Sequence, residues 1–230
     1  MVLRAREGSR QHRDDRSGPE ALGVHAKKKS LVASERHRPE IQAWRCKYLS
    51  RVLAIEASRF VFIDESGAHI AMTREYARGR SGVRVGARIP RNRGTVLTMI
   101  AALSLTGVRA LMTVVGATTK EVFRTFLEKH LLPILNPGDV VVWDGLAAHK
   151  AKGMRELVWS VGAEVILLPA YSPDLNPIEE CWSKVKSLLR TAAMRTVEAL
   201  TVAAHYAVRE VSEADARGWF SHSGYETQPK

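Results

Sequence analysis

The apolar run Val140-Val141-Val142-Trp143, followed directly by Asp144, constrains the fold of this chain more than any other feature. An uninterrupted apolar run of this length is typical of a strand that is covered on both faces. A second apolar run, residues 163–169 (AEVILLP), repeats the pattern, and residues 149–162 between the two have a helical pattern that ends at Gly162. This alternation of strand and helix predicts an α/β fold.

The other segments extend this pattern to a mixed sheet flanked by helices. Residues 60–63 predict a short strand that ends at Asp64 and turns back through residues 64–67 into a second short strand. After a long Arg/Gly-rich loop, two more strands are expected at about 95–104 and 108–115. Helices are expected at 119–135, 176–190 and 196–211, and within 27–55, where Ser34 is a possible N-cap.

One main domain is expected at 59–212, with flanking segments. Residues 1–26 are polar and without periodicity, which predicts a disordered or remnant segment; 27–58 are expected to form a basic helical linker and 213–230 a C-terminal tail. No run of about 18 apolar residues and no apolar signal core occurs, so no membrane contact is predicted and a cytoplasmic, nucleoid-associated location is expected. Cys46 and Cys181 lie far apart without a ligand-like pattern, so neither a zinc site nor a disulfide is predicted.

The formal charge of +11 is concentrated in two segments. Residues 1–59 hold 14 Lys and Arg against 7 Asp and Glu, and residues 74–93 hold seven Arg against one Glu. These segments carry +7 and +6, whereas the rest of the chain carries −2. Basic segments beside a near-neutral core are expected of a protein that binds DNA or RNA, although a solvated basic surface is the alternative.

Three carboxylates lie at the ends of predicted elements. Asp64 ends the first strand, Asp144 ends the buried apolar run, and Glu179 begins the helix after the next strand. Because strand ends and helix starts gather at one rim of an α/β sheet, these side chains are expected to converge. Converging carboxylates repel unless a cation is present, and Mg²⁺ or Mn²⁺ prefers such oxygen ligands. Two such ions about 4 Å apart can activate water or a 3′-hydroxyl for attack on a phosphodiester.

Each carboxylate also has a purely local interpretation. Asp64 and Asp144 stand beside turn-forming residues, so both can be ordinary turn positions. Asn176 is a good N-cap, Pro177 suits the first helical position, and Glu179 then falls where a capping box would place it. Local geometry alone therefore leaves the role of Glu179 open.

Helix phase distinguishes Glu179 from Glu180. Five apolar residues form one stripe at helical spacing, namely Ile178, Cys181, Trp182, Val185 and Leu189. Glu179 borders this stripe, whereas Glu180 lies almost opposite it. We therefore expect Glu179 to face the sheet rim and Glu180 to be solvated, where it can pair with Lys184.

Three sequence blocks, FIDESG (62–67), WDGLAAHK (143–150) and LLPAYSPDLNPIEECWSKVK (167–186), resemble the signature blocks of a known family. They are similar to those of the DDE-type transposases of bacterial insertion sequences related to the mariner elements. The 34 residues between Asp144 and Glu179 match the usual gap in that family. The similarity runs from about residue 27 to about residue 200.

The resemblance implies an RNase H-like fold whose catalytic and metal-binding residues are Asp64, Asp144 and Glu179, with two Mg²⁺ or Mn²⁺ ions. It further implies cleavage at transposon ends and transfer of the freed 3′-hydroxyl into target DNA by a homodimer. His149 is a possible auxiliary residue that contacts a phosphate or a metal-bound water, with helix capping as the alternative. Contacts to the DNA backbone or a partner subunit are expected from the loop arginines, and to DNA from one lysine: Arg74, Arg78, Arg80, Arg84, Arg88, Arg91, Arg93 and Lys150.

Two departures from the family pattern matter. Gly145 stands where the family commonly has an asparagine, so reduced activity is expected. Residues 1–58 are too few and too polar for the helix-turn-helix domains that read the terminal repeats, so the chain is expected to be a truncated remnant or to be joined by frameshifting to an upstream helix-turn-helix polypeptide. The alternatives are another RNase H-like metal nuclease and an inactive or DNA-binding-only remnant.

Overall fold

The computed structural model describes residues 33–145 and 153–225. Three predictions fall outside these ranges: the disordered or remnant segment 1–26, and the contacts expected of His149 and Lys150. By its contacts the chain divides into the units Met1–Ala33 and Ser34–Lys230, and the description below concerns the second. Within the described ranges, every helix is too short or too polar to cross a membrane.

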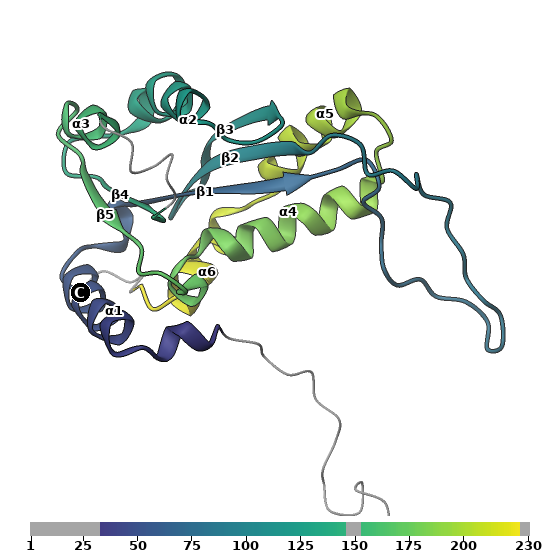
Figure 1. Ribbon diagram of the computed structural model, residues 1–230, viewed down its shortest axis with the longest axis horizontal. Coiled ribbons are helices and arrows are strands. Elements are labelled where there is room, and N and C mark those ends of the chain that lie inside the picture. Colours follow the sequence, from purple (N-terminus) through teal and green to yellow (C-terminus); the bar gives the residue numbers. More distant parts are fainter. Residues whose placement is uncertain (1–32, 146–152, 226–230) are drawn as a thin grey trace, which may run out of the picture. The chain divides into compact units, whose positions relative to one another are not determined.

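The described residues form a five-stranded mixed sheet with the order β3-β2-β1-β4-β5 (Figure 1). β1 pairs antiparallel with β2, and β2 with β3, whereas β4 runs parallel to both β1 and β5. The mixed sheet predicted from the sequence is therefore confirmed. The strands are β1 (Phe60–Ala68), β2 (Leu97–Ser104), β3 (Gly107–Val115), β4 (Val140–Trp143) and β5 (Glu164–Leu167).

Helices cover both faces of this sheet. Side chains of α1, α4, α5 and α6 share one core with one face, and α2 and α3 share a second core with the other. The helices are α1 (Pro39–Val52), α2 (Lys120–Phe126), α3 (Met154–Trp159), α4 (Ile178–Ala192), α5 (Val197–Arg209) and α6 (Glu213–His222). The Thr119 hydroxyl caps α2 by accepting a hydrogen bond from the Val122 amide at 3.3 Å.

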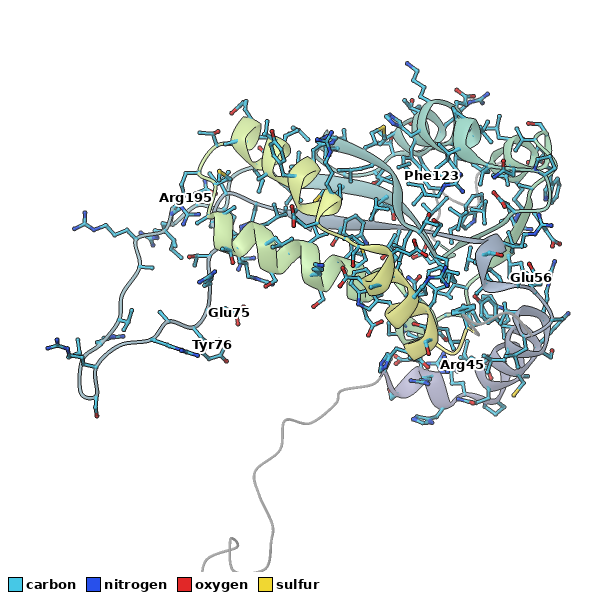
Figure 2. All side chains as sticks on the ribbon, turned by 180° about the vertical axis from the view of Figure 1, so that it is seen from behind. Arg45, Glu56, Glu75, Tyr76, Phe123 and Arg195 are labelled. Atoms are coloured by element: carbon cyan, nitrogen blue, oxygen red, sulfur yellow. The ribbon has the colours of Figure 1, made fainter. Side chains whose placement is uncertain are left out.

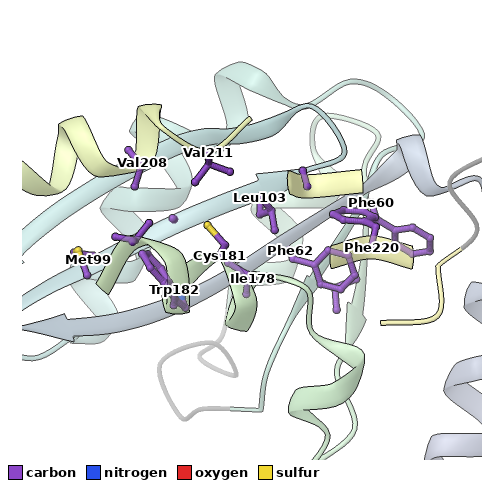
Figure 3. Close-up of a cluster of buried hydrophobic side chains, with 14 of the residues drawn as sticks. Phe60, Phe62, Met99, Leu103, Ile178, Cys181, Trp182, Val208, Val211 and Phe220 are labelled. Atoms are coloured by element: carbon purple, nitrogen blue, oxygen red, sulfur yellow. The ribbon is translucent and has the colours of Figure 1, made fainter. Parts of the chain in front are cut away.

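The central strands contribute to both cores because their side chains alternate between the two faces. In β4, Val140 and Val142 face the α4 side, and Val141 and Trp143 face the α2 side. All four are buried, which explains the uninterrupted apolar run. On the α4 side, the apolar stripe of α4 packs against the sheet, with Cys181 and Trp182 beside Ile178 (Figure 3). Burial of each large apolar side chain contributes roughly 1.5–3 kcal/mol.

The hairpin predicted around residues 64–67 is wrong. β1 continues through Asp64 to Ala68, and its partner is β2, in the register from Phe62↔Leu103 to Ala68↔Leu97. The turn-forming residues of this segment stay extended because the whole length of β2 pairs with them, which outweighs their local preference for a turn. β5 also differs from its prediction as a fully buried strand, since it is an edge strand in which only Ile166 is buried.

The ends of the unit hold more structure than the sequence suggested. Where a tail was expected, α6 begins with a capping box between Ser212 and Asp215, and Phe220 is fully buried. α1, expected as part of a linker, buries Tyr48 in the same core. Ser34 begins a 3-10 turn, Ser34–His37, rather than α1, which starts at Pro39 without a side-chain cap.

Candidate active site

Asp64 lies in the middle of β1 and not at a strand end. It follows the part of β1 that pairs with β4 and lies opposite Ala101 of β2. By strand alternation its side chain shares the face of Phe60 and Phe62, which is the face that α4 covers. The half-buried Asp64 carboxyl therefore lies on the α4 side of the sheet.

Asp144 follows β4 directly. The parallel register pairs Val61 with Val141 and Phe62 with Val142, and continuing it by two residues places Asp144 beside Asp64. Asp144 shares the α4 face with Val140 and Val142, again by alternation, and is half-buried. Neighbouring parallel strands thus bring the two aspartates to one face of the sheet.

Glu179 is in the first turn of α4, on a helix whose apolar stripe is wholly buried against this same face. The Glu179 amide donates a hydrogen bond to the Asn176 carbonyl oxygen at 3.0 Å. The predicted capping box is not formed, because α4 begins at Ile178, after Pro177, and has no side-chain cap. Within α4 itself, therefore, no side-chain cap fixes the first turn, and Glu179 is exposed there.

Glu180 does not lie in the solvated position that helix phase predicted. Its Oε1 atom lies 3.7 Å from Nε2 of His222 in α6, and its Oε2 atom is buried. Lys184, its predicted partner, instead pairs with Asp215 of α6 at 2.6 Å. The unpredicted helix α6 thus covers the side of α4 that the sequence assigned to solvent.

The charges of these carboxylates are coupled. Burial raises the pKa of the Asp64 carboxyl to about 7, and the Glu179 carboxylate adds most to the rise among its charged neighbours. A backbone hydrogen bond at Glu65 opposes the shift, whereas the charges of Glu65 and Asp144 add to it. The charges of both other predicted site residues, Glu179 and Asp144, therefore raise the pKa of Asp64.

The three carboxylates do not close into a compact ligand sphere. Among the described residues, no group of three or more His, Cys, Asp or Glu side chains is arranged to hold a metal ion. Mutual repulsion between carboxylates favours such a spread arrangement in the absence of a cation. The donor set itself, three carboxylates on one face with one of them resisting ionisation, fits the preference of Mg²⁺ and Mn²⁺ for hard oxygen ligands.

The predicted DNA-binding arginines lie on a long loop between β1 and β2. Residues 74–93, which we call the arginine loop, extend away from the sheet without helix or strand structure (Figure 1), and all seven arginines are exposed. None of them forms an ion pair with another described residue; Arg74 donates a hydrogen bond from Nε to Thr191 Oγ1 at 2.9 Å. Glu75 and Tyr76 lie on the loop, and Arg195 lies at its base (Figure 2), where its Nη1 donates to the Ile70 and Met72 carbonyl oxygens.

Three residues near the site were not predicted from the sequence. Arg45 and Asp174 form an ion pair at 2.8 Å, and the Tyr225 hydroxyl donates to the Leu175 carbonyl oxygen at 2.8 Å. One signal was present: Arg45 lies at helical spacing between Ile41 and the buried Tyr48, so a charged residue occupies the apolar face of α1. The pairing itself is visible only in the fold.

Comparison with known proteins gives a family and a fold. A family model described as DDE superfamily endonuclease matches residues 59–201. No curated protein matches the chain.

Solved structures of the mariner transposase Mos1 share the fold. The chain matches the pre-cleavage Mos1 transpososome with a TM-score of 0.71 at 16% identity, over 88% of this chain and 64% of that one. It matches the Mos1 paired-end complex with Mg with a TM-score of 0.65 at 17% identity, over 89% and 64%. For the Mos1 catalytic domain the values are 0.56 and 15%, over 84% and 91%.

The matched lengths show which part of the Mos1 structures shares this fold. The chain spans less than two thirds of the transposase chain in the full complexes, but the match covers 91% of the isolated catalytic domain. Its mixed sheet with flanking helices is the RNase H-like fold of that domain. With the family model covering more than half of its residues, this chain belongs to the DDE superfamily of endonucleases.

Proposed function

We propose that this chain is the catalytic domain of a DNA transposase, which cleaves DNA at transposon ends and joins the freed 3′-hydroxyl to target DNA with Mg²⁺ or Mn²⁺. The observation that carries the proposal is the placement of Asp64 in β1 beside Asp144, which directly follows the neighbouring parallel strand β4, with Glu179 of α4 near enough to raise the pKa of Asp64. A purely structural surface rarely places two carboxylates beside a third, half-buried carboxyl, because their repulsion costs stability.

In this proposal each of the three carboxylates is an oxygen ligand. When bound, the divalent ions supply an activated hydroxyl nucleophile and stabilise the leaving oxygen of the phosphodiester. The relatives support this assignment, since the Mos1 paired-end complex was solved with Mn and also with Mg.

The arginine loop is proposed to hold the DNA backbone. Its arginines are exposed and free of ion pairs with described carboxylates, so little energy is needed to free them for phosphates. The similar Mos1 structures include a paired-end complex with the left transposon end and a strand transfer complex. As the active form we propose a homodimer, joined to helix-turn-helix domains from an upstream polypeptide.

The test is Mn²⁺-dependent nicking of supercoiled plasmid by the purified chain. The substitutions Asp64→Asn, Asp144→Asn and Glu179→Gln should each abolish nicking, because each removes one ligand charge with little change in shape. Glu180→Gln is the matched control on the next residue of α4, and it should retain most of the activity. An equal loss of nicking in the Glu179 and Glu180 variants would refute the assignment of Glu179 as a metal ligand.

The second candidate function is that of a simpler RNase H-like nuclease. It is favoured by Gly145, which stands where the transposase family commonly has an asparagine. Strand transfer separates the two: a precut DNA end with a 3′-hydroxyl should become joined to plasmid in the presence of Mn²⁺. Hydrolysis without joined products favours the nuclease. DNA binding without either product identifies a remnant that retains only its binding surface.

A further inference from the structure

The turn that precedes α4, Pro173–Leu175, is held by side chains from outside the family-matched region 59–201. On one side it contacts α1, and on the other it contacts Tyr225, which follows α6. α4 itself has no side-chain cap to define its first turn. Its start is therefore fixed by what holds the preceding turn.

Asp174 of this turn is clamped by two arginines. Arg45 donates from Nη1 to Oδ1 at 3.2 Å and from Nη2 to Oδ2 at 2.8 Å, and Arg36 donates from Nη2 to Oδ2 at 2.7 Å. Arg45 is only 8% exposed. The Asp174 side chain is 40% exposed, but the Arg45 side chain is only 10% exposed and holds it by two bonds. Such a two-bonded arginine–carboxylate pair fixes orientation as well as distance.

Leu175 of the same turn is held through its backbone. Its carbonyl oxygen accepts the Tyr225 hydroxyl proton at 2.8 Å, and the Tyr48 hydroxyl lies 2.6 Å from that of Tyr225. A tyrosine hydroxyl can donate only one hydrogen bond, and that of Tyr225 donates to Leu175. The Tyr48 hydroxyl is therefore the donor in the hydrogen bond with Tyr225. Both tyrosines are buried, so breaking this chain of bonds leaves polar groups without water.

The two attachments lie directly ahead of Glu179. Asn176, the next residue, is buried, and its carbonyl oxygen accepts the Glu179 amide proton at 3.0 Å. Pro173 and Pro177 flank this stretch and restrict its backbone torsions. A displacement of the turn is therefore passed to the first turn of α4.

We propose that Arg45, Asp174 and Tyr225 are positioning residues that set the location of the Glu179 carboxylate relative to Asp64. The metal-ligand role of Glu179 rests on the function proposed above, whereas the anchoring of the turn does not. By this inference, α1 and the segment through Tyr225 are working parts of the catalytic unit and not a linker and a tail.

The test compares Asp174→Asn with Glu164→Gln in the full chain. Both substitutions remove one negative charge that pairs with an arginine of α1, since Glu164 pairs with Arg51, but only Asp174 belongs to the turn. Tyr225→Phe is a second variant that breaks the other attachment without changing charge. Hydrogen exchange of the Glu179 amide, Mn²⁺ affinity, DNA affinity and the nicking rate are measured for each.

In Asp174→Asn and Tyr225→Phe, we expect the Glu179 amide to exchange at least about 10-fold faster because the local opening becomes easier. Nicking should slow by at least about 10-fold and Mn²⁺ should bind more weakly, while DNA affinity changes by less than about 2-fold. Asp174→Glu, which keeps the charge, should recover part of the rate. Glu164→Gln should match the wild type in all four measurements.

The outcomes separate the two proposals. Unchanged exchange and unchanged nicking in both variants, with the wild type active, overturn the positioning role and leave the proposed function standing. An equal loss in Glu164→Gln also overturns it. A wild-type chain that neither nicks nor binds Mn²⁺ overturns the proposed function, and the exchange rate of Glu179 then decides the anchoring alone.

Discussion

Apart from burial, the Glu179 carboxylate is the largest contributor to the raised pKa of Asp64. The two residues come from different elements, β1 and α4, and repel each other across the face of the sheet. The fold tolerates this repulsion because the apolar core beneath, which includes Phe62 and Trp182, supplies the stability. The repulsion lowers the stability of the cation-free protein, and a bound cation would relieve it.

The first prediction concerns pH and the stability of the metal-free protein. The pKa of Asp64 is about 7 in the folded state against an ordinary value of 3.8, so its contribution to stability is present below about pH 4 and is lost as pH rises through 7. The substitution Asp64→Asn removes this pH-dependent loss of stability, because asparagine does not ionise. It should raise the free energy of unfolding at pH 8 by on the order of 4 kcal/mol, with little effect at pH 4, in urea unfolding curves.

Glu75→Gln is a suitable control for that comparison, because Glu75 is exposed on the arginine loop, away from the sheet (Figure 2). Its variant should follow the wild type at both pH values. A difference between wild type and Asp64→Asn that does not change with pH would contradict the raised pKa.

The second prediction concerns metal binding without catalysis. Mn²⁺ at about 100 times its dissociation constant should stabilise the wild type by roughly 2.7 kcal/mol, measured as a rise in Tm. At one fixed Mn²⁺ concentration, the rise should be larger at pH 8 than at pH 6, because protons compete for Asp64 below its pKa of about 7 and weaken metal binding. Glu179→Gln should lose most of the rise, and an undiminished rise there would place the ion elsewhere.

The third prediction concerns the arginine loop. Replacing Arg84 and Arg88 by alanine should weaken DNA binding equally for all sequences and reduce the salt slope of log K by about 1 for each phosphate that the loop no longer neutralises. The fold should be unaffected, since both side chains are exposed. The matched control is Arg124→Ala on α2, which removes an exposed arginine that pairs with Glu128. A salt slope that is the same in the loop variant and the wild type would exclude the loop from the DNA interface.

Much of the fold follows from local patterns that the sequence displays directly. The run ending at Trp143 predicted a strand buried on both faces, and the stripe from Ile178 to Leu189 predicted the buried face of α4. These succeed because side-chain periodicity and burial are tied by geometry. Asp144 and Glu179 were predicted as site residues for the same reason, because they are polar residues where such patterns stop or start.

The errors involve long-range partners. Asp64 was placed at a turn because residues 64–67 favour turns, and only pairing with β2 keeps them extended. Glu180 was assigned to solvent because α6 was not foreseen, and α6 covers the far side of α4. The clamp on Asp174 joins residues 129 positions apart, which no local pattern encodes.

The hydrogen bond from the Tyr225 hydroxyl to the Leu175 carbonyl oxygen joins residues that are 50 positions apart. The parallel edge of β1 can pair only after β4 has been synthesised. A chain still emerging from the ribosome, even with Asp64, Asp144 and Glu179 already made, lacks the last attachment of the turn before α4. If Tyr225 positions Glu179 as proposed, the alignment of the three carboxylates depends on a residue that is translated after all of them. The order of synthesis would then delay assembly of the proposed site until the segment through Tyr225 has been made.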